Sequence, residues 1–223
     1  MDMQPIWLSL KLAGITTLLL LAIGLPLAWW LAKKRSVIRL MIEALLTMPL
    51  VLPPSVLGFY LLLAFSPQHG VGKWLHNAFD VQFVFSFGGL VLASVIYSIP
   101  FMVSPVKSAF QQLPPSLSQA SYTLGKTPWQ TFWHVLLPNI KPSLLTATVL
   151  TFAHTLGEFG VVLMIGGNIP GVTRVASIAV YNAVEQQDYA SANNYSLALF
   201  AITFVLVAGV FVYNKYQVKS PLA

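Results

Sequence analysis

The stretch IWLSLKLAGITTLLLLAIGLPLAWWLA occupies residues 6–32 and contains one charged residue, Lys11. A helix needs about 20 consecutive apolar residues to cross the hydrocarbon core of a bilayer, so this stretch is long enough to span one. A secretory signal has its basic residues before a shorter apolar run, whereas here the basic residues 33–35 follow it. The stretch therefore predicts a transmembrane helix and not a cleaved signal.

The rest of the chain has the same apolar character. Of its 223 residues, 57% are hydrophobic and 8% are charged, whereas soluble domains carry about 25% charged residues. That composition excludes a soluble globule, a disordered tail and a nucleic-acid-binding protein, and the lack of cysteine excludes disulfides and thiolate metal sites. We expect an all-α polytopic membrane protein with about five transmembrane helices. Their expected bounds are 6–32, 40–65, 81–106, 142–165 and 189–214.

The basic residues predict the orientation of these spans. Nine of the twelve fall on one side of the membrane if the N-terminus is outside, and three lie on or near the other side. Because cytoplasmic loops carry an excess of lysine and arginine, we expect the N-terminus outside, the C-terminus inside and the segment 107–141 in the cytoplasm. The nine are Lys33, Lys34, Arg35, Arg39, Lys107, Lys126, Lys141, Lys215 and Lys219.

The first half of the segment 107–141 predicts a short capped helix. The proline pair at 114–115 stops any helix that arrives from the third span. Ser116 and Gln119 then form the S-x-x-Q pattern of a capping box, which is typical of a helix N-terminus. We expect a helix over 117–124.

A second short helix is expected after Gly125, which ends the first because glycine reaches the left-handed backbone conformation. Thr127-Pro128 and Gln130 form another capping box with proline at the first helical position. This helix should run to residue 136 and end at Leu137-Pro138. Two short helices at a glycine elbow suit insertion into a groove of another protein, and they suit equally a surface hairpin that lies on the bilayer.

The same segment resembles the signature E-A-A-x3-G-x9-I-x-L-P of ABC-importer permeases. Gln119-Ala120-Ser121, Gly125 and Val135-x-Leu137-Pro138 match its spacing, with Gln119 in place of the glutamate and Ser121 in place of the second alanine. In that family the segment is a pair of coupling helices that sits in a cleft of the ATP-hydrolysing subunit. The resemblance therefore implies a docking site that consists of Ser116, Gln119, Ala120, Ser121, Gly125, Val135, Leu137 and Pro138.

Three other stretches, 48–54, 156–160 and 168–174, are similar to the molybdate permease subunit of this family. The resemblance covers about residues 8–213 as one permease domain, and it implies import of molybdate, with tungstate as a co-substrate, across the cytoplasmic (inner) membrane. It also implies that two permease copies form the pathway, two ATP-binding subunits dock inside, and an extracytoplasmic protein delivers the oxyanion. Sulfate permeases share the stretch Gly-Glu-Phe-Gly, so sulfate or another small solute stays open as the substrate.

No enzymatic site is indicated. Gly125-Lys126-Thr127 imitates the end of a nucleotide-binding P-loop, but Ala120 stands where the first glycine belongs and no strand precedes it. The four histidines lack metal-binding spacing, and no catalytic constellation is present. We expect a transport subunit without a cofactor or metal, with ATP and magnesium held by its partner. The alternative from another class is a facilitator or channel that needs no ATPase.

Three prolines, Pro49, Pro53 and Pro54, lie inside the second expected span. Each removes a backbone donor and clashes with the preceding turn. Freed carbonyl groups within a bilayer are tolerated only against protein or a wet cavity, and broken helices line transport sites in other membrane proteins. The prolines therefore predict either a cavity on the pathway or a structural kink.

Hydroxyl side chains share single faces of the third and fourth expected spans, at helical spacings of three or four. They could offer weak hydrogen bonds to a passing oxyanion, or they could hold the helices together. These residues are Ser94, Ser98, Thr148, Thr151 and Thr155.

Glu158 lies inside the fourth expected span, and a carboxylate within the membrane is a functional candidate by default. Because it would repel an anionic substrate, we expect a structural or gating role. Its expected partner is His154, one turn earlier, or Arg174 near the outer mouth. The stretch 174–185 is too short to span, and we expect it to form a short helix at the outer face that is part of the gate.

Overall fold

A computed structural model describes residues 2–33 and 36–218, and the secondary structure in that part of the chain is helical. Lys34, Arg35 and Lys219, which entered the orientation argument, lie outside the described residues. Three helices are long and apolar enough to cross a membrane alone, and up to five spans result if two bent pairs count as one each. The expected all-α membrane fold is confirmed. The three are α1 (Gln4–Ala32), α5 (Phe87–Gln112) and α12 (Tyr189–Val218).

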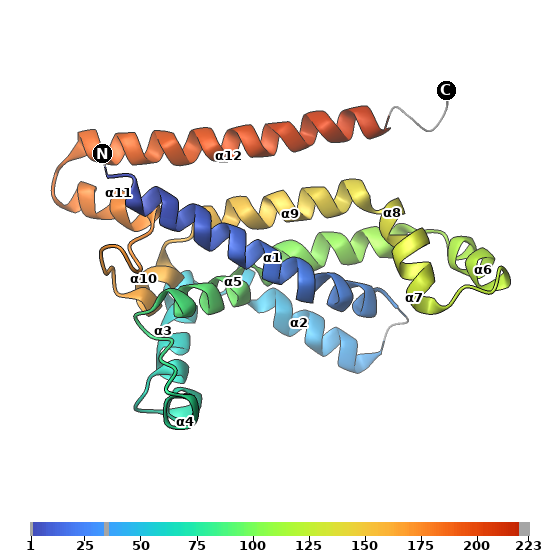
Figure 1. Cartoon of the computed structure of the whole chain (residues 1–223), viewed down its shortest axis with the longest axis horizontal. Coiled ribbons are helices and arrows are strands. Elements are labelled where there is room, and N and C mark those ends of the chain that lie inside the picture. The colour runs from blue at the N-terminus through green and yellow to red at the C-terminus, as the bar shows by residue number, and fades with distance from the viewer. Residues whose placement is uncertain (1, 34–35, 219–223) are drawn as a thin grey trace.

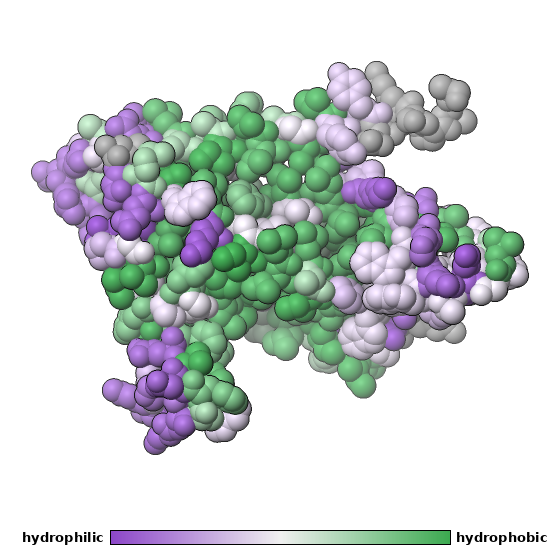
Figure 2. Space-filling view, in the orientation of Figure 1, coloured by the Kyte–Doolittle hydropathy of each residue, from purple (hydrophilic) through white to green (hydrophobic). Residues whose placement is uncertain are grey.

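The long helices lie roughly side by side and define two ends of the molecule (Figure 1). The start of α1 lies at one end with α11 (Ala176–Glu185), and the segment that follows α5 lies at the opposite end. Figure 2 shows polar residues gathered towards both ends and an apolar zone between them. This distribution suits a bundle whose middle lies in lipid, and the outside location of the N-terminus stays a prediction.

α1 and α5 pack closely and carry much of the core. A Cβ atom added at Gly24 of α1 would lie 3.0 Å from the Met102 side chain of α5, so only glycine allows this approach without a shift. Leu20, Met102 and Val106 are fully buried there. By contrast, only 11% of the most apolar stretch of α12 is buried, which leaves an apolar surface for lipid or a partner.

The second expected span, 40–65, is not one straight helix. α2 (Val37–Val51) and α3 (Pro54–Phe65) meet at an angle of 115°. Leu52 and Pro53 are extended at the corner, with ψ angles of 139° and 133°, because a residue that precedes proline disfavours the helical conformation. α2 is tied to α5 by an ion pair between Glu43 and Lys107.

The third expected span is displaced along the sequence. α5 begins at Phe87 and not at residue 81, because Ser86 caps it by accepting a hydrogen bond from the Gly89 N–H (3.1 Å). Before the cap, Phe85 has a φ angle of +60° and donates its N–H to the carbonyl of Ile165 (2.9 Å). The connection between α3 and α5 also contains α4 (Gly70–Phe79), which was not predicted from the sequence.

The fourth expected span, 142–165, is two helices, α9 (Lys141–Leu156) and α10 (Gly160–Gly166). The break follows Gly157, and the carbonyl of Glu158 accepts a hydrogen bond from the Ser177 hydroxyl of α11. A tertiary contact therefore replaces the helical hydrogen bond that the break removes. The short outer helix is present as α11 and the fifth expected span as α12, both close to their expected bounds.

Candidate functional site

The glycine elbow in the inner segment is present. α6 (Pro115–Thr123) ends in the two hydrogen bonds of a Schellman motif. Gly125 N–H donates to the Tyr122 carbonyl (2.9 Å), and Lys126 N–H donates to the Ser121 carbonyl (3.1 Å). Gly125 has a φ angle of +76°, in the left-handed region that glycine adopts at no steric cost. The prediction of a left-handed turn at this residue is therefore confirmed.

The two predicted capping boxes differ in outcome. Thr127 and Gln130 bond each other's backbone N–H groups, at 3.2 Å to the threonine hydroxyl and 3.0 Å to the glutamine oxygen, and begin α7 (Pro128–Thr131). The box expected at Ser116 is absent: α6 begins at Pro115, which moves Ser116 inside the first turn, and its N-cap Pro114 makes no side-chain bond. Proline at the first helical position needs no partner for its nitrogen, which explains the shift.

The second helix continues beyond its expected end at Leu137-Pro138. A π-helical turn (Phe132–Leu136) follows α7 and leads into α8 (Leu137–Asn139). Proline within a regular helix clashes with the carbonyl four residues earlier, and the wider π turn relieves that clash. The whole segment then bends by 78° into α9.

The docking residues implied by the family signature are mostly on the surface of this segment. One of them is buried, Ser121, whose hydroxyl lies 2.8 Å from the hydroxyl of buried Thr131 and so links α6 to α7. The substitution of serine for the alanine of the signature therefore adds a contact across the elbow. Ser116, Gln119, Ala120, Gly125 and Pro138 are exposed, and Val135 and Leu137 are half-buried.

The segment is joined to the spans by aromatic packing. Phe132 is 2% exposed, and its ring centroid lies 4.8 Å from that of Trp29 in α1 and 5.9 Å from that of Phe110 in α5. Lys33 lies over the Trp29 ring, 3.9 Å from its centroid. Phe132 therefore packs this segment against the ends of α1 and α5 where Trp29 and Phe110 lie.

A second polar site lies at the break between α9 and α10. Glu158 is 3% exposed, and its two carboxylate oxygens accept hydrogen bonds from Ser94 and Ser98 of α5. The Ser98 hydroxyl also lies 2.9 Å from Thr155 Oγ1 and 2.9 Å from His154 Nδ1. The structure thus brings together residues that the sequence analysis treated on separate spans, and it places His154 Nδ1 3.6 Å from the carboxylate.

The other predicted pathway residues are placed differently. Thr148 and Thr151 donate to carbonyls of their own helix, at 2.8 and 2.7 Å, as threonine commonly does in a membrane helix. Pro49 is buried inside α2, whereas Pro53 and Pro54 form the corner before α3. The threonines that share one face of α9 are therefore divided: Thr155 joins the Glu158 cluster, whereas Thr148 and Thr151 are satisfied within the helix.

The breaks of the second and fourth spans meet. A Cβ atom at Gly160 would lie 2.9 Å from Pro54 Cβ and 3.3 Å from Ser55 N, so the two broken spans are in contact at these residues. Beside this contact is an open cavity of about 620 Å³, which Glu158 and His154 line. Ser55 and Tyr97 also line it, and the sequence analysis missed both, although each adjoins a predicted residue.

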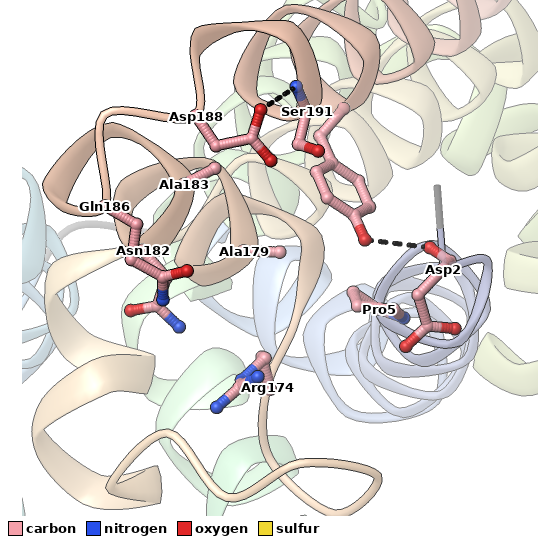
Figure 3. Close-up of a pocket in the computed structure, with 10 residues that line it drawn as sticks. Asp2, Pro5, Arg174, Ala179, Asn182, Ala183, Gln186, Asp188 and Ser191 are labelled. Atoms are coloured by element: carbon pink, nitrogen blue, oxygen red, sulfur yellow. Dashed lines mark hydrogen bonds between the residues drawn. The ribbon is translucent and has the colours of Figure 1, made fainter.

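Arg174 belongs to another cluster, at the end of the bundle where α1 starts (Figure 1). Its Nε donates to Asn168 Oδ1 (2.8 Å), and Asn182 donates to the same oxygen (3.1 Å), so Asn168 and not Glu158 is the partner found for Arg174. Arg174 borders a pocket of about 210 Å³ that also contains Asp2 and Asp188 (Figure 3). A hydrogen bond from Ser191 lowers the pKa of Asp188. Two carboxylates beside one guanidinium do not suit a dianion.

Replacing Glu158 with glutamine should lower the stability of the fold and the transport rate without changing which anion the protein prefers. The amide can accept from one serine but must donate towards the other, and a mismatched buried polar contact costs about 1–3 kcal/mol. We expect a lower melting temperature and a lower transport rate, with Glu185→Gln, at an exposed residue, as the near-neutral control. A switch in anion preference with normal stability would contradict the structural role.

Comparison with known proteins defines the class of this one. Residues 24–220 match the family described as the binding-protein-dependent transport system inner membrane component. The fold also matches a bacterial alginate ABC transporter, with a TM-score of 0.76 over 93% of this chain and 76% of that one, at 19% identity. The chain belongs to this family: it is the multi-pass inner-membrane permease of a binding-protein-dependent ABC importer.

Two curated relatives narrow the comparison. The chain is 42% identical to the molybdenum transport system permease protein ModB of Azotobacter vinelandii, over 97% of this chain and 96% of the relative. It is 35% identical to the sulfate transport system permease protein CysT of Escherichia coli K12, over 84% of this chain and 67% of the relative. As in other members, the permease is not an enzyme: ATP is bound by a separate ATPase, and a periplasmic binding protein completes the importer.

Proposed function

We propose that this chain carries molybdate, and tungstate with it, into the cell. The observation that carries this assignment is the 42% identity to a molybdenum permease over nearly the full length of both chains. Sulfate is the second candidate, because a sulfate permease is 35% identical, although only 67% of its length is matched. Both substrates are tetrahedral dianions, so the same chemistry of weak, uncharged contacts serves either one.

The elbow at Gly125 is proposed as the docking site for the ATPase subunit. Four large apolar side chains on it are exposed although they lie outside the spans, and a docking surface needs such anchors. The capped start of α7, the positive φ of Gly125 and the Ser121–Thr131 contact hold the two helices at one angle. The exposed side chains are Tyr122, Leu124, Trp129 and Trp133.

The anion is proposed to pass beside the broken spans. Support comes from the cavity of about 620 Å³ next to the meeting point of Pro54 and Gly160, since backbone without helical hydrogen bonds is found in membranes where it lines such a cavity. In this proposal Glu158 holds α5 and the α9–α10 break together. It does not touch the anion.

A second copy of the chain is proposed to complete the pathway. The cavity is open in a single chain, and α3 and α4 project sideways from the bundle (Figure 1). Much of the apolar surface of α3 is also uncovered, with Phe59 45% and Tyr60 62% exposed. A partner permease that covers this arm would enclose the cavity from its open side.

ATP-dependent uptake into proteoliposomes tests the assignment. The permease is reconstituted with its own ATPase and delivery protein, and uptake of molybdate, tungstate and sulfate is measured with and without ATP. We expect molybdate and tungstate uptake that requires ATP and exceeds sulfate uptake at least about tenfold, the ratio that 1.4 kcal/mol of discrimination gives. A preference for sulfate would support the second candidate, and uptake without ATP would contradict both.

A further inference from the structure

When Glu158 is ionised, the hydrogen atoms of its cluster follow by elimination. Ser98 Oγ has one proton and two lone pairs, and it faces three polar atoms: Glu158 Oε1, Thr155 Oγ1 and His154 Nδ1. An ionised carboxylate only accepts, so Ser98 gives its proton to Glu158 and accepts from the other two. Nδ1 of His154 must then carry a proton.

The other nitrogen of the ring is left for the cavity. His154 Nε2 has no hydrogen-bond partner among the described residues, and it is not a buried atom. The side chain is 21% exposed and lines the cavity with Ser55 and Tyr97. The Phe101 ring stacks on the imidazole with 3.8 Å between centroids, which fixes the plane in which Nε2 lies.

In the empty state this nitrogen cannot hold an anion. A neutral ring with its proton on Nδ1 presents a lone pair at Nε2, and a lone pair repels an oxyanion oxygen. One additional proton, taken from water in the cavity, changes this in either of two ways. It can stay on Nε2 with Nδ1 still protonated, or it can leave Glu158 protonated, which then donates to Ser98. In the second case the transfer runs along the hydrogen bonds: the added proton binds Nε2, the Nδ1 proton passes to Ser98, and the Ser98 proton passes to Glu158.

Both outcomes present an N–H group to the cavity, and both hold one proton more than the empty state. We propose that His154 is the residue that contacts the oxyanion in this cavity, and that the relay Glu158–Ser98–His154 takes up one proton for each anion bound. The added proton offsets part of the repulsion between a dianion and the Glu158 carboxylate. This inference rests on the proposed import of an oxyanion.

Few other ionisable groups can share this role. The ionisable residues that line the cavity in the described part of the chain are His154, Glu158 and Tyr97. Of the helices packed against α9, α1 carries Lys11, whose amine lies 4.8 Å from the centroid of the Phe87 ring. α5 carries Lys107, which pairs with Glu43, and α12 carries Lys215 in its last turn. Arg174 is held by Asn168. His154 and Glu158 are therefore the two groups of this cavity to which the proposal assigns the added proton.

The test is the pH profile of uptake at limiting molybdate, divided by the ATP hydrolysed in the same vesicles, from about pH 5.5 to 8.5. For the wild type we expect a decline that approaches tenfold per pH unit on the alkaline side, because binding consumes one proton. His154→Gln and Ser98→Ala should flatten the profile to less than about twofold per unit. His69→Gln and Ser196→Ala make the same chemical changes outside the cluster, and they should keep the wild-type profile.

The outcomes separate this inference from the proposed function. If the wild type takes up no oxyanion at any pH, the proposed function fails. If it takes up molybdate but His154→Gln keeps the wild-type profile, only the relay is overturned. If Ser98→Ala fails to assemble, His154→Gln alone decides the test. Removing the imidazole of His154 leaves Ser98 bonded to Glu158 and Thr155.

Discussion

Replacing Gly125 with valine should lower transport and transport-stimulated ATP hydrolysis together, by about tenfold or more. No atom lies within 4 Å of a Cβ placed at this residue, so the effect does not come from crowding. It comes from the φ angle of +76°, which is a strained conformation for a β-branched residue and costs about 1–3 kcal/mol. Because 1.4 kcal/mol is a factor of ten in an equilibrium, the elbow would leave its docking geometry in most molecules.

The experiment measures both activities in proteoliposomes, together with the amount of ATPase that co-purifies with the permease. Gly125→Asn is the matched control, because asparagine tolerates the left-handed region, and it should retain most of both activities. The spans lie away from the elbow, so the valine variant should still be present in the membrane. Full ATPase association with full transport in Gly125→Val would show that the turn is incidental to docking.

Replacing Gly160 should produce the second large effect, on the stability of the membrane bundle. The added Cβ of Gly160→Ala would lie 2.9 Å from Pro54 Cβ and 3.3 Å from Ser55 N, and neither a proline ring nor a backbone nitrogen can move out of the way cheaply. Overpacking of this kind costs about 1–3 kcal/mol. Gly160→Val should cost more, separate α3 from α10 and abolish most transport.

Thermal unfolding of the purified permease tests this prediction. Gly209→Ala in α12 is the control, since nothing lies within 4 Å of its Cβ position. Alanine favours a helix over glycine by about 0.5–1 kcal/mol, so the control should be as stable as the wild type or slightly more stable. An unchanged melting temperature and full transport in Gly160→Val would mean that the two breaks do not pack as described.

Hydropathy and local turn chemistry were sufficient to predict most of the membrane spans and the elbow at Gly125 from the sequence. A run of apolar residues such as 6–32 predicts a span without reference to the rest of the fold, because the thickness of the bilayer sets how long an apolar helix must be to cross it. Gly125 and the Thr127–Gln130 box were likewise predictable, since each acts within a few residues of itself. The box at Ser116 was predicted wrongly because two local signals competed and Pro115 took the first helical position.

The tertiary structure alone decided where the spans break and what the breaks form. Nothing between residues 142 and 165 excluded a continuous helix, and the break at Glu158 is stable because Ser94 and Ser98 of α5 and Ser177 of α11 satisfy its polar groups. The corner before Pro54 was suggested by its prolines, but its angle of 115° follows from packing against α10. A sequence records which groups a break would leave unpaired, whereas only the fold brings their partners within bonding distance.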